Sequence, residues 1–429
     1  MGKIFSVIFS CKDKEKGLIE RDSYLWNFFA GFLNAFQSVI ILMVITRVLD
    51  LESAGIFTIA YATSNLFLTI GKFGMRNFQV TDAQTKYSFK TYQKSRIVTC
   101  IAMFLVTIGY VLYMMWRGGY QWDKALIVFF MCLLKLIDAI EDIYHGLYQQ
   151  NNRLDMASEL LAKRMALTIV VFVISLLLVR SLLPSLIITF IISGIYCLFS
   201  LLYCNRFFIL ENSVKKETSN PLIGLLKDNF SLFASSFLIF YIGNAPKYAI
   251  DANLNNELQA CYGFIAMPVF VVSLLNAFLY QPILSRLAIE WTEKEYGIFL
   301  KEITKQCIYI FGLTLITIIG GNLCGIPVLS WIYATDLTNY KTEMLILLAG
   351  GGALALSGFL SVVLTIIRAQ NCIVLGNLIV GLFAFLLSPV FVTNYGVMGA
   401  AVVYLILMLA LNVILLFFSY KQIRINLNL

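Results

Sequence analysis

The stretch that decides the fold is Ala125-Leu-Ile-Val-Phe-Phe-Met-Cys-Leu-Leu134, followed directly by Lys135-Leu-Ile-Asp-Ala-Ile-Glu-Asp-Ile-Tyr-His-Gly-Leu-Tyr-Gln149. It begins as an uninterrupted apolar run and then takes on a lysine, three acids and the single histidine of the chain. A charged side chain inside a bilayer is costly, so such residues face other protein groups or a water-filled cavity. The stretch therefore predicts a membrane helix with one polar face.

The same apolar character extends along the whole chain. Of the 429 residues, 60% are hydrophobic and 13% charged, whereas a soluble domain carries about 25% charged residues. The apolar residues form blocks of about 20, the length that spans a bilayer as a helix. The sequence predicts an all-α polytopic membrane protein with twelve transmembrane helices, at 25–46, 54–75, 96–116, 123–149, 156–179, 182–204, 222–247, 258–283, 306–331, 343–367, 372–392 and 397–420.

The basic residues predict the orientation of these helices. If the N-terminus is cytoplasmic, most of the 32 Lys and Arg fall on the inner side, which is the positive-inside pattern. Both termini are then cytoplasmic. The net charge of +8 is explained by this topology, with anionic membrane lipids as the partners and no role in binding nucleic acid.

Two weak internal matches indicate two halves. Gly55-Ile-Phe-Thr-Ile-Ala60 resembles Gly263-Phe-Ile-Ala-Met267, and Lys86-Tyr-Ser-Phe-Lys-Thr-Tyr92 resembles Glu295-Tyr-Gly-Ile-Phe-Leu-Lys301, at almost the same offset. We expect two six-helix lobes related by a pseudo-twofold axis along the membrane normal. The predicted segments are an interfacial N-terminus (1–24), a first lobe (25–210), a cytoplasmic linker (211–221), a second lobe (222–420) and a cytoplasmic tail (421–429).

Two features of the second half carry their own expectations. Residues 286–306 are expected to form an amphipathic helix on the inner surface, with Leu287, Trp291, Phe299 and Ile303 facing lipid. Gly350-Gly-Gly352 lies inside the tenth predicted span, where it either permits bending or allows neighbouring helices to pack closely.

The sequence offers no catalytic machinery. No phosphate-binding loop, catalytic triad, paired carboxylates on a soluble scaffold or metal-ligand spacing is recognised, and the nine Cys read as small buried apolar residues. The chain is predicted not to be an enzyme and to need no cofactor or metal.

The polar residues of the opening stretch lie on one face of a helix. At about 100° per residue, Lys135, Asp138, Asp142, His145 and Gln149 fall within about 80°, with Glu141 about 40° outside this arc. Lys135 and Asp138 are one turn apart and can pair, which indicates a cavity at that depth. For His145 the alternative is the solvated end of a helix projecting into the cytosol. The amides of Asn34, Gln37 and Asn244 either line the same cavity or form hydrogen bonds between helices.

Three segments carry a family resemblance: Ile45-Thr-Arg-Val-Leu-Asp-Leu-Glu-Ser-Ala-Gly-Ile-Phe57, Gly71-Lys-Phe-Gly-Met-Arg-Asn-Phe-Gln79 and Asp138-Ala-Ile-Glu-Asp-Ile-Tyr-His-Gly-Leu-Tyr-Gln149. Over essentially the whole chain, the sequence resembles the bacterial polysaccharide repeat-unit flippases of the multidrug/oligosaccharidyl-lipid/polysaccharide exporter superfamily. The resemblance implies alternating-access transfer of undecaprenyl-diphosphate-linked oligosaccharides, for capsule or O-antigen, to the outer leaflet of the bacterial cytoplasmic membrane. Cations that would line the cavity and hold the diphosphate are, by position, Arg47, Lys72, Arg76, Lys135, Lys247 and Arg368.

The same residues allow further roles and an alternative function. The acids Asp138, Glu141 or Asp142 could couple transport to H⁺ or Na⁺, and the polymerase and glycosyltransferases of the pathway are candidate partners. A cation-coupled multidrug exporter of the same superfamily is the alternative function, and it would favour an acidic cavity without cations at mid-depth. A membrane glycosyltransferase or polymerase would need a large outer loop, and the predicted outer loops are short.

Overall fold

The computed structural model describes residues 15–82, 86–205, 220–280 and 283–426. The first part of the predicted N-terminal segment, most of the predicted linker and the end of the tail lie outside these ranges. All elements that it describes are helices. They are α2 (Lys16–Val48), α3 (Leu51–Lys72), α4 (Met75–Thr81), α5 (Phe89–Trp116), α6 (Trp122–Gln150), α7 (Leu154–Val179), α8 (Leu182–Cys204), α9 (Pro221–Asn253), α10 (Asn256–Tyr280), α11 (Leu284–Thr292), α12 (Tyr296–Gly320), the π-helix η3 (Gly321–Gly325), α13 (Ile326–Tyr333), the 3₁₀-helix η4 (Thr338–Tyr340), α14 (Lys341–Ile366) and α15 (Gln370–Asn426).

The all-helical membrane architecture predicted from the sequence is confirmed. Within the described ranges, nine helices are long and apolar enough to cross a membrane. Of the predicted ranges outside these nine helices, α6 covers 123–149 and α10 covers 258–280. Helix α15, one of the nine, covers the last two predicted ranges, with non-helical dihedrals at Gly396 between them. The number of twelve spans and the cytoplasmic placement of the termini stay predictions.

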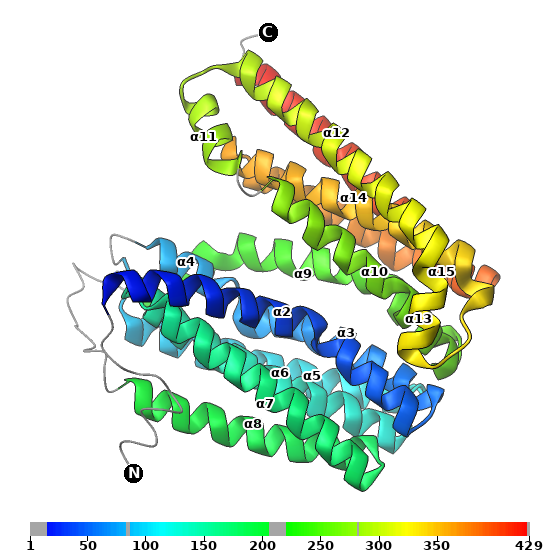
Figure 1. Cartoon of the computed structure of the whole chain (residues 1–429). Coiled ribbons are helices and arrows are strands. Elements are labelled where there is room, and N and C mark those ends of the chain that lie inside the picture. Colours follow the sequence, from blue (N-terminus) through cyan, green and yellow to red (C-terminus); the bar gives the residue numbers. More distant parts are fainter. Residues whose placement is uncertain (1–14, 83–85, 206–219, 281–282, 427–429) are drawn as a thin grey trace. The chain divides into compact units, whose positions relative to one another are not determined.

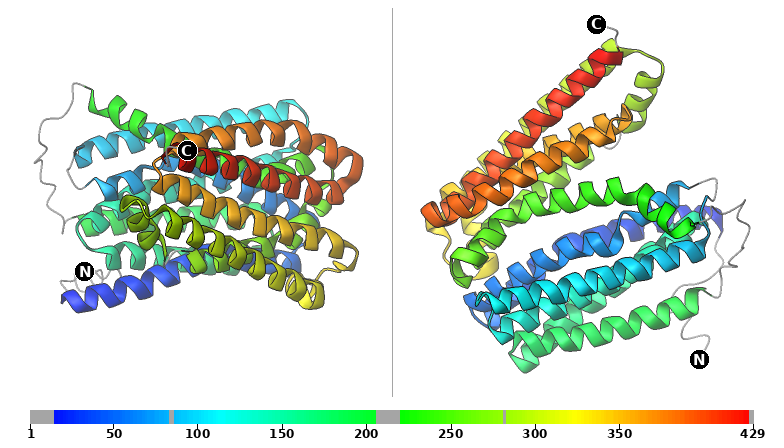
Figure 2. Two further views of the ribbon diagram at one scale, coloured as in Figure 1. Left: turned by 90° about the horizontal axis from the view of Figure 1, so that it is seen from above. Right: turned by 180° about the vertical axis from the view of Figure 1, so that it is seen from behind.

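The chain divides into two compact units, Met1–Phe237 and Leu238–Leu429. In the first unit, α6 lies at the centre and packs against α3, α4, α5, α7 and α8, while α2 covers α7 and α3 (Figure 1). Figure 2 shows the same helices from above and from behind. A central helix explains how the polar face of α6 avoids lipid, because it is enclosed by protein.

The second unit is organised around α14, which packs against α10, α12 and α15. Gly350 and Gly351 face the Tyr404 ring and Val269, and a Cβ on Gly352 would overlap the side chain of Thr314. Helix α14 runs unbroken through all three glycines. Of the two readings of this triplet, the structure favours close helix packing over bending.

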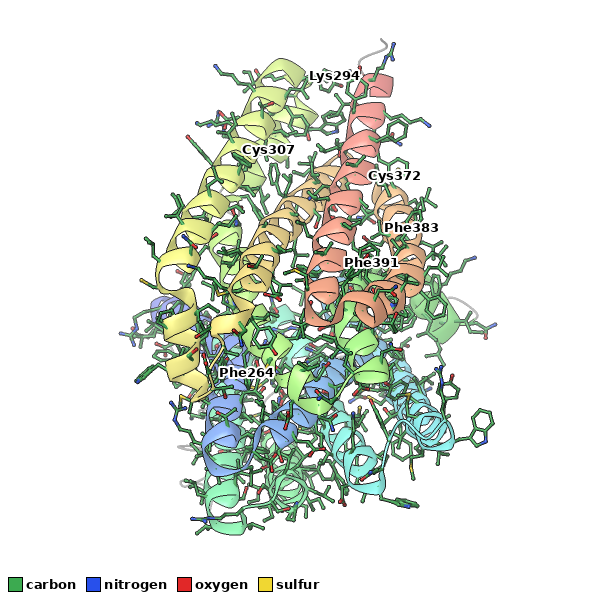
Figure 3. The ribbon with its side chains drawn as sticks, turned by 90° about the vertical axis from the view of Figure 1, so that its right-hand side faces the viewer. Phe264, Lys294, Cys307, Cys372, Phe383 and Phe391 are labelled. Carbon is green, nitrogen blue, oxygen red and sulfur yellow. The ribbon has the colours of Figure 1, made fainter. Side chains whose placement is uncertain are left out.

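The expectation of a surface helix over 286–306 is wrong. The segment is two helices, α11 and α12, separated by a turn in which Lys294 is left-handed (φ 62°) (Figure 3). Leu287 and Phe299 are buried in an apolar cluster with Phe359, and Trp291 and Ile303 pack against that cluster. The turn folds α11 back so that its apolar face meets α12 and α14 in place of lipid.

The first part of α9 packs with the first unit. Asp228 accepts hydrogen bonds from Lys86 Nζ (2.6 Å) and the Tyr87 hydroxyl (2.9 Å). The Phe233 ring stacks on Phe73 at 4.4 Å. The boundary between the compact units thus falls inside a continuous helix, after Phe237.

Candidate functional site

The polar face of α6 is buried inside the first unit. Lys135, Asp138, Asp142 and His145 are each exposed by less than a tenth of their surface. For His145, which is 2% exposed, the reading as a solvated helix end is wrong. Helix α6 therefore brings a row of ionisable side chains into the interior, where each charge needs a partner.

Arg164 of α7 supplies the main partner. Its Nε donates to Glu141 Oε2 at 2.7 Å, and its Nη2 donates to Asp138 Oδ1 at 2.5 Å. Lys135 Nζ donates to Asp138 Oδ2 at 3.2 Å and lies 5.0 Å from the centre of the Tyr61 ring. The pairing of Lys135 with Asp138 predicted from their spacing is confirmed. Two cations and two carboxylates thus neutralise one another, an arrangement that meets the requirement for buried charge.

A second cluster surrounds Asp142, one turn further along α6. Arg96 Nη2 donates to Asp142 Oδ2 at 3.0 Å, while Lys72 Nζ and Arg76 Nη1 lie 3.6 Å and 4.0 Å from Oδ1. Arg76 also donates from Nη2 to Gln149 Oε1 at 3.0 Å. Three cations therefore share one carboxylate, so this end of the stripe has an excess of positive charge.

The backbone between α3 and α4 places two of these cations. Helix α3 ends at Lys72, Phe73 and Gly74 are both left-handed (φ 51° and 67°), and α4 starts again at Met75. The turn brings Arg76 back toward the same carboxylate as Lys72. Hydrogen bonds to α5 fix the end of α3 before this turn, because the Gly71 carbonyl accepts from Arg96 and from Thr99 Oγ1.

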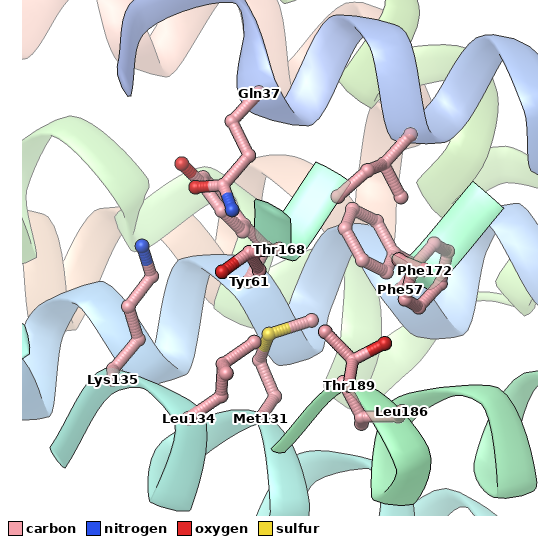
Figure 4. A pocket seen from close by; sticks show the side chains of 11 residues that line it. Gln37, Phe57, Tyr61, Met131, Leu134, Lys135, Thr168, Phe172, Leu186 and Thr189 are labelled. Atoms are coloured by element: carbon pink, nitrogen blue, oxygen red, sulfur yellow. The ribbon is translucent and has the colours of Figure 1, made fainter. Parts of the chain in front are cut away.

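A small cavity lies beside the other end of the stripe. Gln37, Tyr61, Lys135 and apolar neighbours line it (Figure 4), and its volume is about 10 Å³. That is room for about one water molecule, far too little for a sugar. Gln37 is buried, and its Oε1 has no hydrogen-bond partner among the described residues. Gln37 and Lys135 both line this small space, and their part in a transport cavity stays a prediction.

The remaining predicted residues lie apart from these clusters. Asn34 is exposed on α2, and Arg47, also exposed, donates to the Met43 carbonyl of its own helix. Asn244 and Lys247 are half-buried on the second-unit part of α9, where Asn244 donates to the Phe240 carbonyl. Arg368 is exposed in a left-handed turn (φ 61°) after α14.

Sequence reasoning missed the two arginines that organise the site. The positive-inside pattern accounts for Arg96 and Arg164 as charges near the cytoplasmic surface, yet they are 3% and 1% exposed. A signal was available, because Arg164 lies well inside the predicted span 156–179 and Arg96 opens the predicted span 96–116. The argument that singled out Lys135 applies equally to Arg164.

A family model described as "Polysaccharide biosynthesis protein" matches residues 21–288 of this chain. The chain is also similar to the capsular polysaccharide biosynthesis protein CapF of Staphylococcus aureus. The two are 24% identical over 391 residues, which cover 88% of this chain and 94% of that protein.

Solved membrane transporters share the fold. The lipid II flippase MurJ in an inward closed conformation aligns with a TM-score of 0.66 and 16% identity, covering 94% of this chain and 88% of that one. A multidrug resistance MATE family transporter of the MOP superfamily, inward-facing, aligns with a TM-score of 0.61 and 12% identity, covering 92% and 94%. At these identities the likeness establishes the fold alone.

Proposed function

The chain belongs to the family of polysaccharide biosynthesis proteins, and from that premise we propose that it is an alternating-access flippase for polyprenyl-diphosphate-linked oligosaccharides. It is a multi-pass membrane protein, in bacteria of the cytoplasmic membrane. The cargo would be turned from the inner to the outer leaflet for synthesis of a surface polysaccharide.

The observation that carries this proposal is the excess of positive charge around Asp142. Lys72 and Arg76 are the accessible members of that cluster, with side chains 41% and 26% exposed. A diphosphate offers several anionic oxygens, and arginine and lysine pair with such oxygens most strongly where water is partly excluded. Lys72 and Arg76 would therefore hold the diphosphate of the lipid carrier.

The proposed topology places these cations where the cargo starts. In a twelve-span arrangement with cytoplasmic termini, α3 runs inward, so Lys72 at its end and Arg76 just beyond lie near the inner membrane surface. The headgroup of a lipid carrier in the inner leaflet lies at the same depth. The lipid tail would stay in the bilayer while the charged headgroup enters between the helices.

The pairing of the acids argues against the alternative, a cation-coupled multidrug exporter. A site for cationic drugs would be expected to expose carboxylates without competing cations. Here Asp138 and Glu141 are bonded to Arg164, and Asp142 is bonded to Arg96. The name of the curated relative, a capsular polysaccharide biosynthesis protein, also supports a glycan as cargo.

The proposal is tested by following lipid-linked oligosaccharide in a strain that lacks the protein. We expect the oligosaccharide to accumulate in the inner leaflet, and the wild-type chain to restore its passage while a Lys72→Ala/Arg76→Ala variant at equal abundance does not. Undisturbed arrival of the oligosaccharide at the outer leaflet in the deletion strain would refute the proposal. Accumulation of cationic dyes in that strain, without a change in polysaccharide, would favour the drug exporter.

A further inference from the structure

The two oxygens of Asp142 are used in different ways. Oδ2 accepts a direct hydrogen bond from Arg96 at 3.0 Å, whereas Oδ1 lies 3.6 Å from Lys72 Nζ and 4.0 Å from Arg76 Nη1. Charged N–H···O hydrogen bonds are about 2.7–2.9 Å long, so the two pairs on Oδ1 are attractions between charges without a direct bond. Asp142 is therefore hydrogen-bonded through Oδ2, whereas Oδ1 makes only longer ion-pair contacts.

The hydrogen-bonded pair is buried, and the two more distant cations are accessible to solvent. The side chains of Arg96 and Asp142 are 4% and 8% exposed, while those of Lys72 and Arg76 are considerably more accessible. The buried pair cannot separate without leaving a charge unpaired in the interior. Lys72 and Arg76, which we call the rim cations, can leave Oδ1 by moving their own side chains toward an anion that arrives from outside.

We propose that Asp142 is the resident counter-anion of Lys72 and Arg76, which it neutralises in the empty flippase and yields to the diphosphate of the cargo. This inference rests on the proposed function and adds a residue that sets the affinity for the headgroup. One carboxylate carries a single negative charge, so a diphosphate with more charge and more oxygens displaces it. Because Asp142 competes for the same cations, it also weakens the bound state and favours release.

The direct test is binding of inorganic pyrophosphate to the full-length protein in phosphatidylcholine nanodiscs. Asp142→Asn removes the negative charge beside Lys72 and Arg76, although Arg76 keeps its hydrogen bond to Gln149. We expect this variant to bind pyrophosphate about tenfold more tightly than the wild type. Glu159→Gln is the matched control, since it removes another buried carboxylate of the same unit, one paired with Lys163 at 2.8 Å. This control should leave the pyrophosphate affinity unchanged. Equal or weaker binding by Asp142→Asn would overturn the inference.

A second variant guards against misfolding, because Asp142→Asn leaves Arg96 without its carboxylate. Arg96→Met/Asp142→Asn removes both buried charges, which is often tolerated, and the Gly71 carbonyl keeps its hydrogen bond from Thr99 at 2.9 Å. We expect the same gain in pyrophosphate affinity. An unchanged affinity in a folded double variant would overturn the role of Asp142.

Competition experiments separate the sources of the anion. Undecaprenyl diphosphate should displace pyrophosphate from the Asp142→Asn variant, and phosphatidylglycerol should not. Equal displacement by phosphatidylglycerol would overturn the assignment, because the anion would then be a bulk lipid headgroup. Tighter pyrophosphate binding in a protein that moves no lipid-linked oligosaccharide in proteoliposomes would support the counter-anion role and refute the proposed cargo.

Discussion

Arg164 on α7 and Glu141 on α6 form a bidentate ion pair in the interior of the first unit. Both Nε and Nη2 of the arginine donate to this carboxylate, and Nη2 also reaches Asp138. One guanidinium therefore joins two acids of one helix to its neighbour. This geometry makes Arg164 the residue on which the buried network depends.

Removing Arg164 should destabilise the protein strongly. Arg164→Met leaves Glu141 without a cation and Asp138 with Lys135 alone, and breaking a buried pair in this way costs about 3–5 kcal/mol. The thermal unfolding temperature of the purified protein should fall accordingly. Arg180→Met, which changes an exposed arginine after the last turn of the same helix, should leave it almost unchanged. Equal unfolding temperatures for the two variants would be incompatible with a structural role for Arg164.

Asp138 should matter more for stability than Lys135. Asp138 accepts from both Lys135 and Arg164, whereas Lys135 makes one hydrogen bond to a carboxylate and one contact with the Tyr61 ring. We expect Asp138→Asn to lower the unfolding temperature more than Lys135→Met. A double-mutant cycle should give a coupling of about 0.5–3 kcal/mol, as for residues in contact. The reverse order of the two single variants would contradict this hydrogen-bond assignment.

Gly71 should not tolerate a methyl group. A Cβ there would lie 2.8 Å from Met103 Sδ and 2.9 Å from the Ala139 Cβ. Met103 can move, but Ala139 cannot yield without displacing α6, so Gly71→Ala should cost about 1–3 kcal/mol of unfolding free energy. Gly109→Ala on α5, with no atom within 4 Å of the new Cβ, should be neutral or slightly stabilising. A neutral Gly71→Ala would show that α3 and α6 do not approach as closely as described.

The contact of Lys86 with Asp228 should weaken at high pH. The hydrogen bond that Lys86 donates to Asp228 raises the pKa of Lys86 above its ordinary value of 10.5. A raised lysine pKa means that the pair contributes fully below pH 10.5 and loses its contribution as the pH rises through the folded-state pKa. The difference in unfolding temperature between wild type and Asp228→Asn should therefore be constant near neutrality and shrink above pH 10.5. Because Lys86 is 53% exposed, that difference should be small throughout.

The sequence predicted the helices and the polar face well, because both depend on local periodicity. The 3.6-residue repeat placed Lys135 and Asp138 one turn apart, and their ion pair is present. It could not show that α7 supplies Arg164 to the same face, since that contact depends on the packing of α6 against α7. Arg96 escapes a reading of local periodicity for the same reason, because its partner Asp142 lies on a different helix.

The prediction of a surface helix over 286–306 is wrong for a related reason. An amphipathic pattern shows that a helix has an apolar face, but lipid and protein satisfy that face equally well. The turn around Lys294 allows Leu287 and Phe299 to meet in one protein cluster. Helix periodicity cannot foresee a left-handed residue at a position that is not glycine.

The central claim, that Lys72 and Arg76 hold the diphosphate of a lipid-linked glycan, is tested most directly in proteoliposomes. The measurement is the rate at which a fluorescent undecaprenyl-diphosphate-linked oligosaccharide crosses the bilayer. Lys90→Gln/Lys94→Gln, which removes two exposed lysines at the start of α5, is the control for lost charge. We predict that Lys72→Gln/Arg76→Gln lowers the rate at least about tenfold, which corresponds to about 1.4 kcal/mol, and that the control keeps the wild-type rate. Equal rates for wild type and both double variants would contradict the account.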